Sequence, residues 1–115
     1  MPGVIIINMN QKQQKELLQS LSQEIANLLG DKLDCILMYG SFARGEARSD
    51  SDLDILIVVR GKFDYAALIR HTSEIIARLS LDNDVVISRA FISKERFEDE
   101  KSPFTLNVQR EGIPI

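Results

Sequence analysis

The apolar run from Leu53 to Val59 constrains the fold of this chain more than any other feature. Its seven residues, LDILIVV, include one polar side chain, that of Asp54. Side chains of a strand alternate between two faces, so a nearly continuous apolar run is typical of a strand that is covered on both faces. The run therefore predicts a central strand in a sheet with helices packed against it.

Three aspartates alternate where this strand begins, at Asp50, Asp52 and Asp54. Because strand side chains alternate, Asp52 and Asp54 are expected to point to one face, with Cα atoms about 7 Å apart. Asp50 is expected to remain in the preceding loop. Carboxylates this close repel one another and resist desolvation, so the segment is either a solvated acidic turn or a site that binds a cation. The Asp-x-Asp pattern alone leaves both interpretations open.

Helical and strand patterns alternate along the rest of the chain and predict its elements. We expect, in order, a helix capped by Asn10 and ending near Leu29, a strand at 35–41 that breaks at Gly40, the strand 53–59, a helix at 64–80, a strand at 84–92, a helix from Ser93 to about Glu100, and a last helix after Pro103 that closes at Gly112. This order predicts an α/β (α+β) fold with a single mixed β-sheet and flanking helices. A chain of 115 residues is expected to form one domain over residues 1–115.

Composition and charge exclude several functional classes. The net charge of −3 argues against a protein that grips a nucleic-acid backbone, because such binding depends on clustered Lys and Arg. Cys35 is the single cysteine, which excludes an internal disulfide, and its apolar surroundings indicate a buried thiol. The apolar segment Val4 to Ile7 is too short for the core of a signal peptide and is interpreted as an edge strand or a contact surface. We expect a cytoplasmic protein that contacts neither membranes nor nucleic acid directly.

A third carboxylate, Asp84, opens the apolar stretch NDVVISRAF. If the two apolar strands are neighbours, Asp52, Asp54 and Asp84 form a cluster at one edge of the sheet. Carboxylate oxygens in that number suit Mg²⁺, which a few carboxylates hold together with water and substrate phosphates. Two such ions about 3.5–4 Å apart stabilise both the attacking and the leaving oxygen in phosphoryl transfer.

The Gly40-Ser41 pair follows the first predicted strand and is a candidate phosphate-binding turn. Glycine allows a phosphate to approach the backbone closely, and the following N–H groups and the Ser41 hydroxyl can donate to phosphate oxygens. Arg44 and Arg48 could add charge-assisted contacts. Taken alone, a Gly-Ser pair is a common turn. His71, the lone histidine, falls on the polar side of its helix and is expected to be a surface residue.

Taken together, these parts resemble a family signature. Gly40-Ser41, ten intervening residues, Asp52-x-Asp54 and a later Asp84 resemble the motif of the DNA polymerase beta-like nucleotidyltransferase superfamily. The stretch GSFARGEARSDSDLDILIVV is particularly similar to the minimal nucleotidyltransferases. The resemblance implies that Gly40 and Ser41 position the phosphates of a nucleotide and that Asp52 and Asp54 bind two Mg²⁺ ions. It assigns the third metal-binding and catalytic carboxylate to Asp84.

The resemblance also gives Asp82 as the alternative third carboxylate and places Arg44 among the nucleotide-binding residues. It further implies a reaction and a partner. Minimal nucleotidyltransferases commonly act as the antitoxin beside a HEPN-domain RNase toxin, in type VII-like toxin–antitoxin systems. The implied activity is protein adenylylation, in which AMP passes from ATP to a tyrosine hydroxyl of the toxin and pyrophosphate is released. Two alternatives remain open: a nucleotidyltransferase that acts on a small hydroxylated molecule such as an aminoglycoside, and an antitoxin that neutralises its partner by binding alone.

Overall fold

The computed structural model describes residues 9–115 of this chain, so the segment Val4 to Ile7 lies outside the described residues. The elements are α1 (Gln11–Leu29), a 3-10 turn η1 (Gly30–Lys32), β1 (Leu33–Tyr39), α2 (Ser41–Arg44), β2 (Leu53–Val59), α3 (Tyr65–Asn83), β3 (Ile87–Ser93), α4 (Lys94–Asp99), α5 (Pro103–Glu111) and β4 (Ile113–Pro114). None of the helices within residues 9–115 combines the length and the apolar character that crossing a membrane requires.

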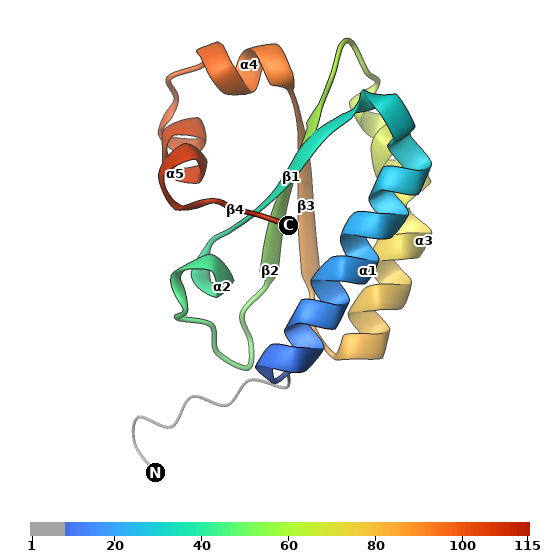
Figure 1. Cartoon of the computed structure of the whole chain (residues 1–115), viewed down its shortest axis with the longest axis vertical. Helices are drawn as coiled ribbons and strands as arrows, with labels where there is room; N and C mark the ends of the chain where they lie inside the picture. Colours follow the sequence, from blue (N-terminus) through green and yellow to red (C-terminus); the bar gives the residue numbers. More distant parts are fainter. Residues whose placement is uncertain (1–8) are drawn as a thin grey trace.

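One sheet of four strands, in the order β3-β2-β1-β4, organises the molecule. Strand β2 runs parallel to β3 and antiparallel to β1, and β4 pairs antiparallel with the other edge of β1. Figure 1 shows α1 and α3 side by side on one face of this sheet, with α4 and α5 on the opposite face. The predicted fold class, a single mixed sheet with flanking helices, is confirmed.

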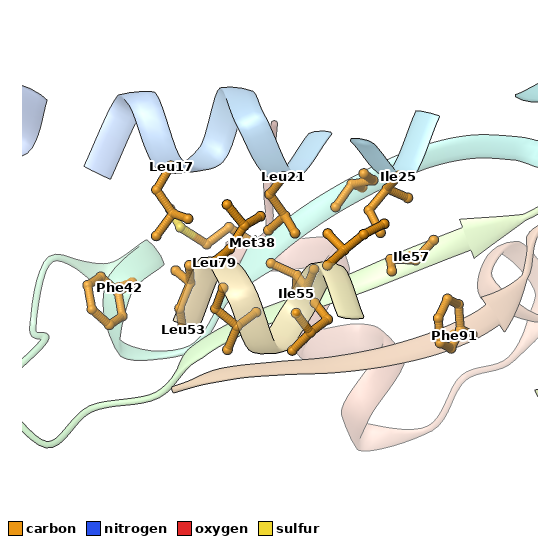
Figure 2. Close-up of a cluster of buried hydrophobic side chains, with 14 of the residues drawn as sticks. Leu17, Leu21, Ile25, Met38, Phe42, Leu53, Ile55, Ile57, Leu79 and Phe91 are labelled. Carbon is orange, nitrogen blue, oxygen red and sulfur yellow. The ribbon is translucent and has the colours of Figure 1, made fainter. Parts of the chain in front are cut away.

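Two apolar clusters, one on each face, explain why β2 is almost wholly hydrophobic. Leu53, Ile55 and Ile57 point toward α1 and α3, where they join the larger core (Figure 2). Leu56 and Val58 point the other way and pack with Val108 of α5. All five side chains are at most 1% exposed, so β2 is the central, doubly covered strand that its sequence predicts.

Short polar side chains begin each of the longer helices. Asn10 accepts a hydrogen bond from the backbone N–H of Gln13 (2.8 Å) and Asp64 accepts one from Ala67 (3.2 Å). Such caps satisfy N–H groups that have no partner inside the helix. The predicted start of α1 at Asn10 is confirmed, and so is the cap that Ser93 provides for α4.

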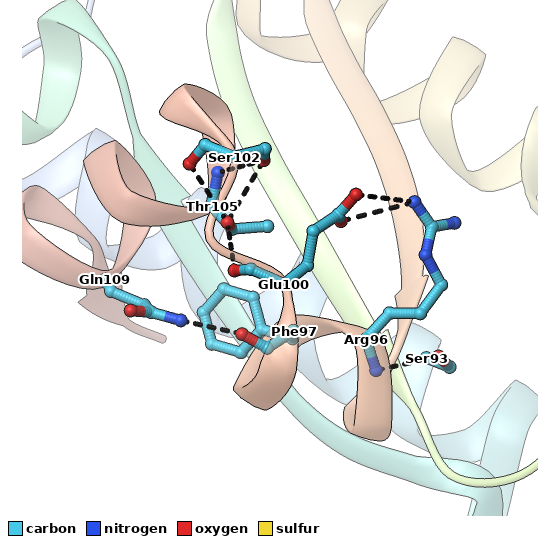
Figure 3. A network of polar contacts seen from close by, with 7 residues as sticks. All are labelled: Ser93, Arg96, Phe97, Glu100, Ser102, Thr105 and Gln109. Carbon is cyan, nitrogen blue, oxygen red and sulfur yellow. Dashed lines mark hydrogen bonds and ion pairs between the residues drawn. The ribbon is translucent and has the colours of Figure 1, made fainter.

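A polar network fixes α5 against α4 (Figure 3). The buried Thr105 hydroxyl donates to the backbone carbonyl of Glu100 (2.7 Å), and the Gln109 amide donates to the carbonyl of Phe97 (2.6 Å). Since both carbonyls belong to the α4 region, the network sets the direction in which α5 leaves α4. Glu111, the last residue of α5, thereby reaches the loop that follows β1.

The predicted start of the third strand at Asp84 is wrong. Helix α3 continues to Asn83, Asp84 adopts a left-handed conformation (φ 50°, ψ 48°) as its C-cap, and β3 begins at Ile87. Val85 and Val86 follow the cap and give the sequence a strand-like pattern, and the Val86 carbonyl accepts the Leu53 N–H of β2 (2.8 Å) just before β3 begins. The two-residue strand β4 was not predicted.

Candidate active site

Asp52 and Asp54 lie where β2 begins, at one edge of the sheet. Asp54 is the second residue of β2, and Asp52 is exposed just before the strand. Alternation places both on the face that carries α5, opposite to the buried Leu53. The predicted convergence of these two carboxylates therefore agrees with the register of the strand.

The electrostatics of Asp54 reflect its burial and its charged neighbours. The pKa of the Asp54 carboxyl is raised above its ordinary value, mainly because partial burial penalises its charge and further because the Asp52 carboxylate repels it. The Arg44 guanidinium acts in the opposite direction and lowers that pKa. A hard divalent cation such as Mg²⁺ would relieve the repulsion between these two carboxylates, and carboxylate oxygens are ligands that suit it. The residues present therefore fit a Mg²⁺ site.

Gly40 lies against Asp54 and joins β1 to α2. It has a positive φ of 78°, and a Cβ atom built on it would lie 2.4 Å from Oδ2 of Asp54. That gap is far shorter than a van der Waals contact, so a side chain at position 40 would displace the carboxylate. The absence of a side chain also leaves backbone accessible to a phosphate, as the Gly-Ser pair predicts. Ser41 follows as the first residue of α2.

Arg44 ends α2 between two carboxylates. Its guanidinium forms ion pairs with Glu46 (Nε to Oε1, 3.3 Å) and with Glu111 (Nη1 to Oε1, 3.3 Å). Glu111 also accepts a hydrogen bond from the backbone N–H of Gly40 (3.3 Å). Glu111 could not be selected from local patterns, because 67 residues separate it from Arg44 and nothing near it in the sequence marks the contact.

The structure does not bring Asp84 to the other two aspartates. Asp84 caps α3 and lines a shallow hollow of about 350 Å³ with the loop residues Ser49, Asp50 and Ser51. Within residues 9–115, no group of three or more His, Cys, Asp or Glu side chains is arranged to hold a metal ion. Among the described residues the expected three-carboxylate cluster does not form, because the helix extends one turn further than its pattern predicts, and the metal-binding and catalytic role of Asp84 stays a prediction. Asp82 lies within that last turn.

Two other residues flank Asp54 across the sheet. Tyr39 of β1 and Ser88 of β3 are its register partners, and paired residues share a face. The Tyr39 ring packs edge-on against Phe104 of α5, with ring centroids 5.5 Å apart. Burial raises the pKa of the Tyr39 hydroxyl, and the Asp54 charge raises it further. Ser88 therefore occupies the β3 position beside Asp54 where the sequence suggested a carboxylate.

The remaining candidates lie outside this group. Arg48 is exposed in the loop, where its backbone N–H donates to the Ser51 hydroxyl (2.8 Å). His71 is exposed on α3, as its pattern predicts. Cys35 is half-buried beside the smaller apolar cluster. The site is therefore formed by the end of β1, α2, the start of β2 and the end of α5.

Comparisons with known proteins place this chain in a family. A family model described as "Polymerase beta, Nucleotidyltransferase" matches residues 23–113. The chain is 30% identical to "Putative protein adenylyltransferase MJ0141" of Methanocaldococcus jannaschii over 87% of this chain and 96% of that protein. It is 35% identical to "Putative protein adenylyltransferase MJ0604" of the same organism, over 78% of this chain and 89% of that protein.

Solved structures share the fold at lower identity. A structure described as a toxin-antitoxin with AMP-PNP superposes with a TM-score of 0.59 at 18% identity, covering 87% of this chain and 70% of that one. A nucleotidyltransferase structure from Sulfolobus solfataricus gives a TM-score of 0.56 at 19% identity, covering 86% and 76%. The matched family model spans most of the chain and includes the Gly40 loop, the Asp52–Asp54 pair and the first of the two residues of β4. The chain therefore belongs to the polymerase beta nucleotidyltransferase family.

Proposed function

We propose that this chain is the antitoxin of a toxin–antitoxin pair and a protein adenylyltransferase. It would transfer AMP from ATP to a tyrosine hydroxyl of a HEPN-domain RNase toxin and thereby block the toxin. The two M. jannaschii relatives carry protein adenylyltransferase in their names, and a fold neighbour is a toxin-antitoxin complex with AMP-PNP. These names support the choice of a protein as the acceptor.

The contact between Gly40 and Asp54 carries the proposal. It places Gly40, whose lack of a side chain allows phosphates to approach the backbone, directly against Asp54. The Asp54 carboxylate is repelled by its neighbour Asp52. A nucleoside triphosphate needs both features, since its phosphates require close backbone approach and its charge requires divalent cations. Ser41 and Arg44 follow Gly40 on α2 and would contact the same phosphates.

Asp52 and Asp54 are the residues that would hold Mg²⁺, two ions in our proposal. When bound, the metal neutralises phosphate charge and stabilises the attacking and leaving oxygens. In the reaction, the tyrosine oxygen would form a bond to the α-phosphorus of ATP, the bond from that phosphorus to the pyrophosphate oxygen would break, and the hydroxyl proton would pass to water. This chain contributes orientation of the phosphates through the Gly40 loop and of the reacting centre through the Asp52–Asp54 pair.

The test is co-expression of this chain with a HEPN toxin, followed by intact-mass measurement of the toxin. We expect added AMP on the toxin with the wild-type chain and none with Asp52→Asn or Asp54→Asn. Asp50→Asn, a change in the adjacent loop, is the matched control and should retain modification. Neutralisation that persists in the Asp52→Asn and Asp54→Asn variants would instead show an antitoxin that acts by binding. Transfer of labelled AMP to an aminoglycoside but not to protein would support the small-molecule alternative.

A further inference from the structure

Glu111, the last residue of α5, contacts the proposed phosphate loop at two points. Its Oε1 accepts the Gly40 backbone N–H at 3.3 Å, and its two oxygens lie 3.3 and 3.4 Å from Nη1 of Arg44. The Glu111 side chain is 21% exposed, whereas that of Arg44 is 44% exposed. A mostly buried carboxylate therefore holds both a backbone donor and a cation of the loop.

The backbone on either side of Glu111 is fixed by packing. On the C-terminal side, the Gly112 N–H donates to the Val108 carbonyl (2.7 Å), and a Cβ at position 112 would lie 2.5 Å from that oxygen. Strand β4 then pairs with β1 at Leu37 and Met38, shortly before Gly40. The end of α5 is thus attached to the same strand that leads into the loop, and Glu111 is directed to it from a rigid support.

The position of Glu111 is electrostatically unfavourable without these partners. A carboxylate in the last turn of a helix faces the negative end of the helix dipole. The Gly40 N–H and the Arg44 guanidinium offset that repulsion, and a charge-assisted pair of this kind is stronger and more directional than a neutral hydrogen bond. Arg44 is also paired with Glu46, but that carboxylate belongs to the loop itself.

We propose that Glu111 is a positioning residue for nucleotide binding: by accepting the Gly40 N–H and pairing with the Arg44 guanidinium, it fixes the turn whose following N–H groups and Ser41 hydroxyl receive the phosphates of ATP. This inference rests on the proposed nucleotidyltransferase function. It makes the α5–β4 segment a structural part of the site. It also predicts that Glu111 affects the affinity for ATP more than the rate of the chemical step, because the Asp52–Asp54 pair remains intact.

The test compares Glu111→Gln, Glu111→Ala and the control Glu46→Gln in the full chain, with its toxin as the acceptor. We expect the KM for ATP to rise about tenfold in Glu111→Gln and further in Glu111→Ala, since glutamine still accepts the Gly40 N–H but loses the ion pair. The kcat should change by less than about threefold. Glu46→Gln should leave KM within about twofold, because the exposed pair contributes little.

Direct titration of the same variants with ATP, followed by thermal shift and by the ¹⁵N chemical shift of Gly40, gives a readout that does not depend on turnover. We expect the Gly40 amide resonance to move in both Glu111 variants and not in Glu46→Gln. An unchanged KM, or tighter ATP binding in Glu111→Gln, would overturn the inference, the latter by showing that Glu111 competes with phosphate. A wild-type chain that neither binds ATP nor transfers AMP would overturn the proposed function itself.

Discussion

Gly40 and Asp54 are packed so closely that the carboxylate occupies the space that a Cβ at position 40 would need, 2.4 Å from Oδ2. The contact joins the loop after β1 to the start of β2. It links the two halves of the proposed site, one for phosphates and one for metal, through a single steric relationship. Each half therefore constrains the position of the other.

Gly40→Ala is expected to damage both stability and activity. The new methyl group must displace the Asp54 carboxylate while the backbone keeps a positive φ of 78°, which together cost about 2–5 kcal/mol in the free energy of unfolding. Gly45→Ala is the matched control, since Gly45 also has a positive φ, 72°, but nothing lies within 4 Å of its Cβ position. That variant should lose about 1–2 kcal/mol. Equal losses in urea denaturation of the two variants would contradict the steric argument.

Asp84→Asn is expected to retain AMP transfer within about threefold of wild type, because asparagine tolerates the left-handed cap conformation and the residue lies beside the 49–51 loop. Asp52→Asn should lose more than about 100-fold, since losing a metal ligand removes several kcal/mol of transition-state stabilisation. Initial rates of labelled AMP incorporation compare the two. A comparable loss in Asp84→Asn would restore the role that the sequence pattern assigned to it.

Ser88→Asp is expected to introduce a third carboxylate beside Asp54. Without metal, the added like charge across the strand pair should lower stability by about 0.2–1 kcal/mol. With Mg²⁺ present, the same variant should gain more in melting temperature than the wild type, because a third oxygen ligand strengthens the site. Ser88→Asn controls for size. Thermal melts with and without Mg²⁺ that show the same shift in all three proteins would place Ser88 away from the metal.

The reactivity of the Cys35 thiol reports on the electrostatics at the opposite end of β1. Burial raises the pKa of its thiol above the ordinary value of 9.0, the Asp34 charge and hydrogen bond raise it further, and Lys94 lowers it. Fewer thiols are ionised at about pH 8 than in an unfolded chain, so alkylation should be slow. Asp34→Asn should accelerate alkylation at that pH and Lys94→Gln should slow it. The order of the two rates, measured with iodoacetamide, is the check.

The raised pKa of Cys35 also sets the direction in which stability changes with pH. Because the folded state favours the neutral thiol, Cys35 contributes stability that is fully present below its ordinary pKa and is lost as the pH rises through the raised value. Cys35→Ser should therefore show a weaker loss of stability than the wild type between neutral and strongly alkaline pH. Urea midpoints across that range measure the difference.

Local patterns were sufficient to predict the parts of the site that lie on β2. Asp52 and Asp54 share a face because strand geometry fixes their spacing, and the apolar residues that follow them identify the central strand. Asn10 and Ser93 were likewise predictable, since a capping side chain acts on an N–H three residues away. These features need only short-range information.

The contacts made through tertiary structure were not predictable in the same way. Glu111 meets Gly40 only because α5 is directed by its contacts with α4 and by the pairing of β4 with β1. Ser88 lies beside Asp54 because β3 begins at Ile87, and that start depends on how far α3 extends. The left-handed cap at Asp84 moved the strand by three residues, which a pattern of apolar residues could not show.

Strand β2 is hydrogen-bonded on both edges and covered on both faces, and this has a consequence for motion within the site. Amides in such a strand exchange with solvent only through large opening events, whereas the exposed residues from Arg44 to Asp50 exchange through local ones. Asp54, on the proposed metal side of the site, thus belongs to the slowest part of the molecule, and the loop after α2 belongs to a faster part. If the proposed function holds, a nucleotide would meet in Asp54 a carboxylate whose backbone stays fixed until the strand itself opens.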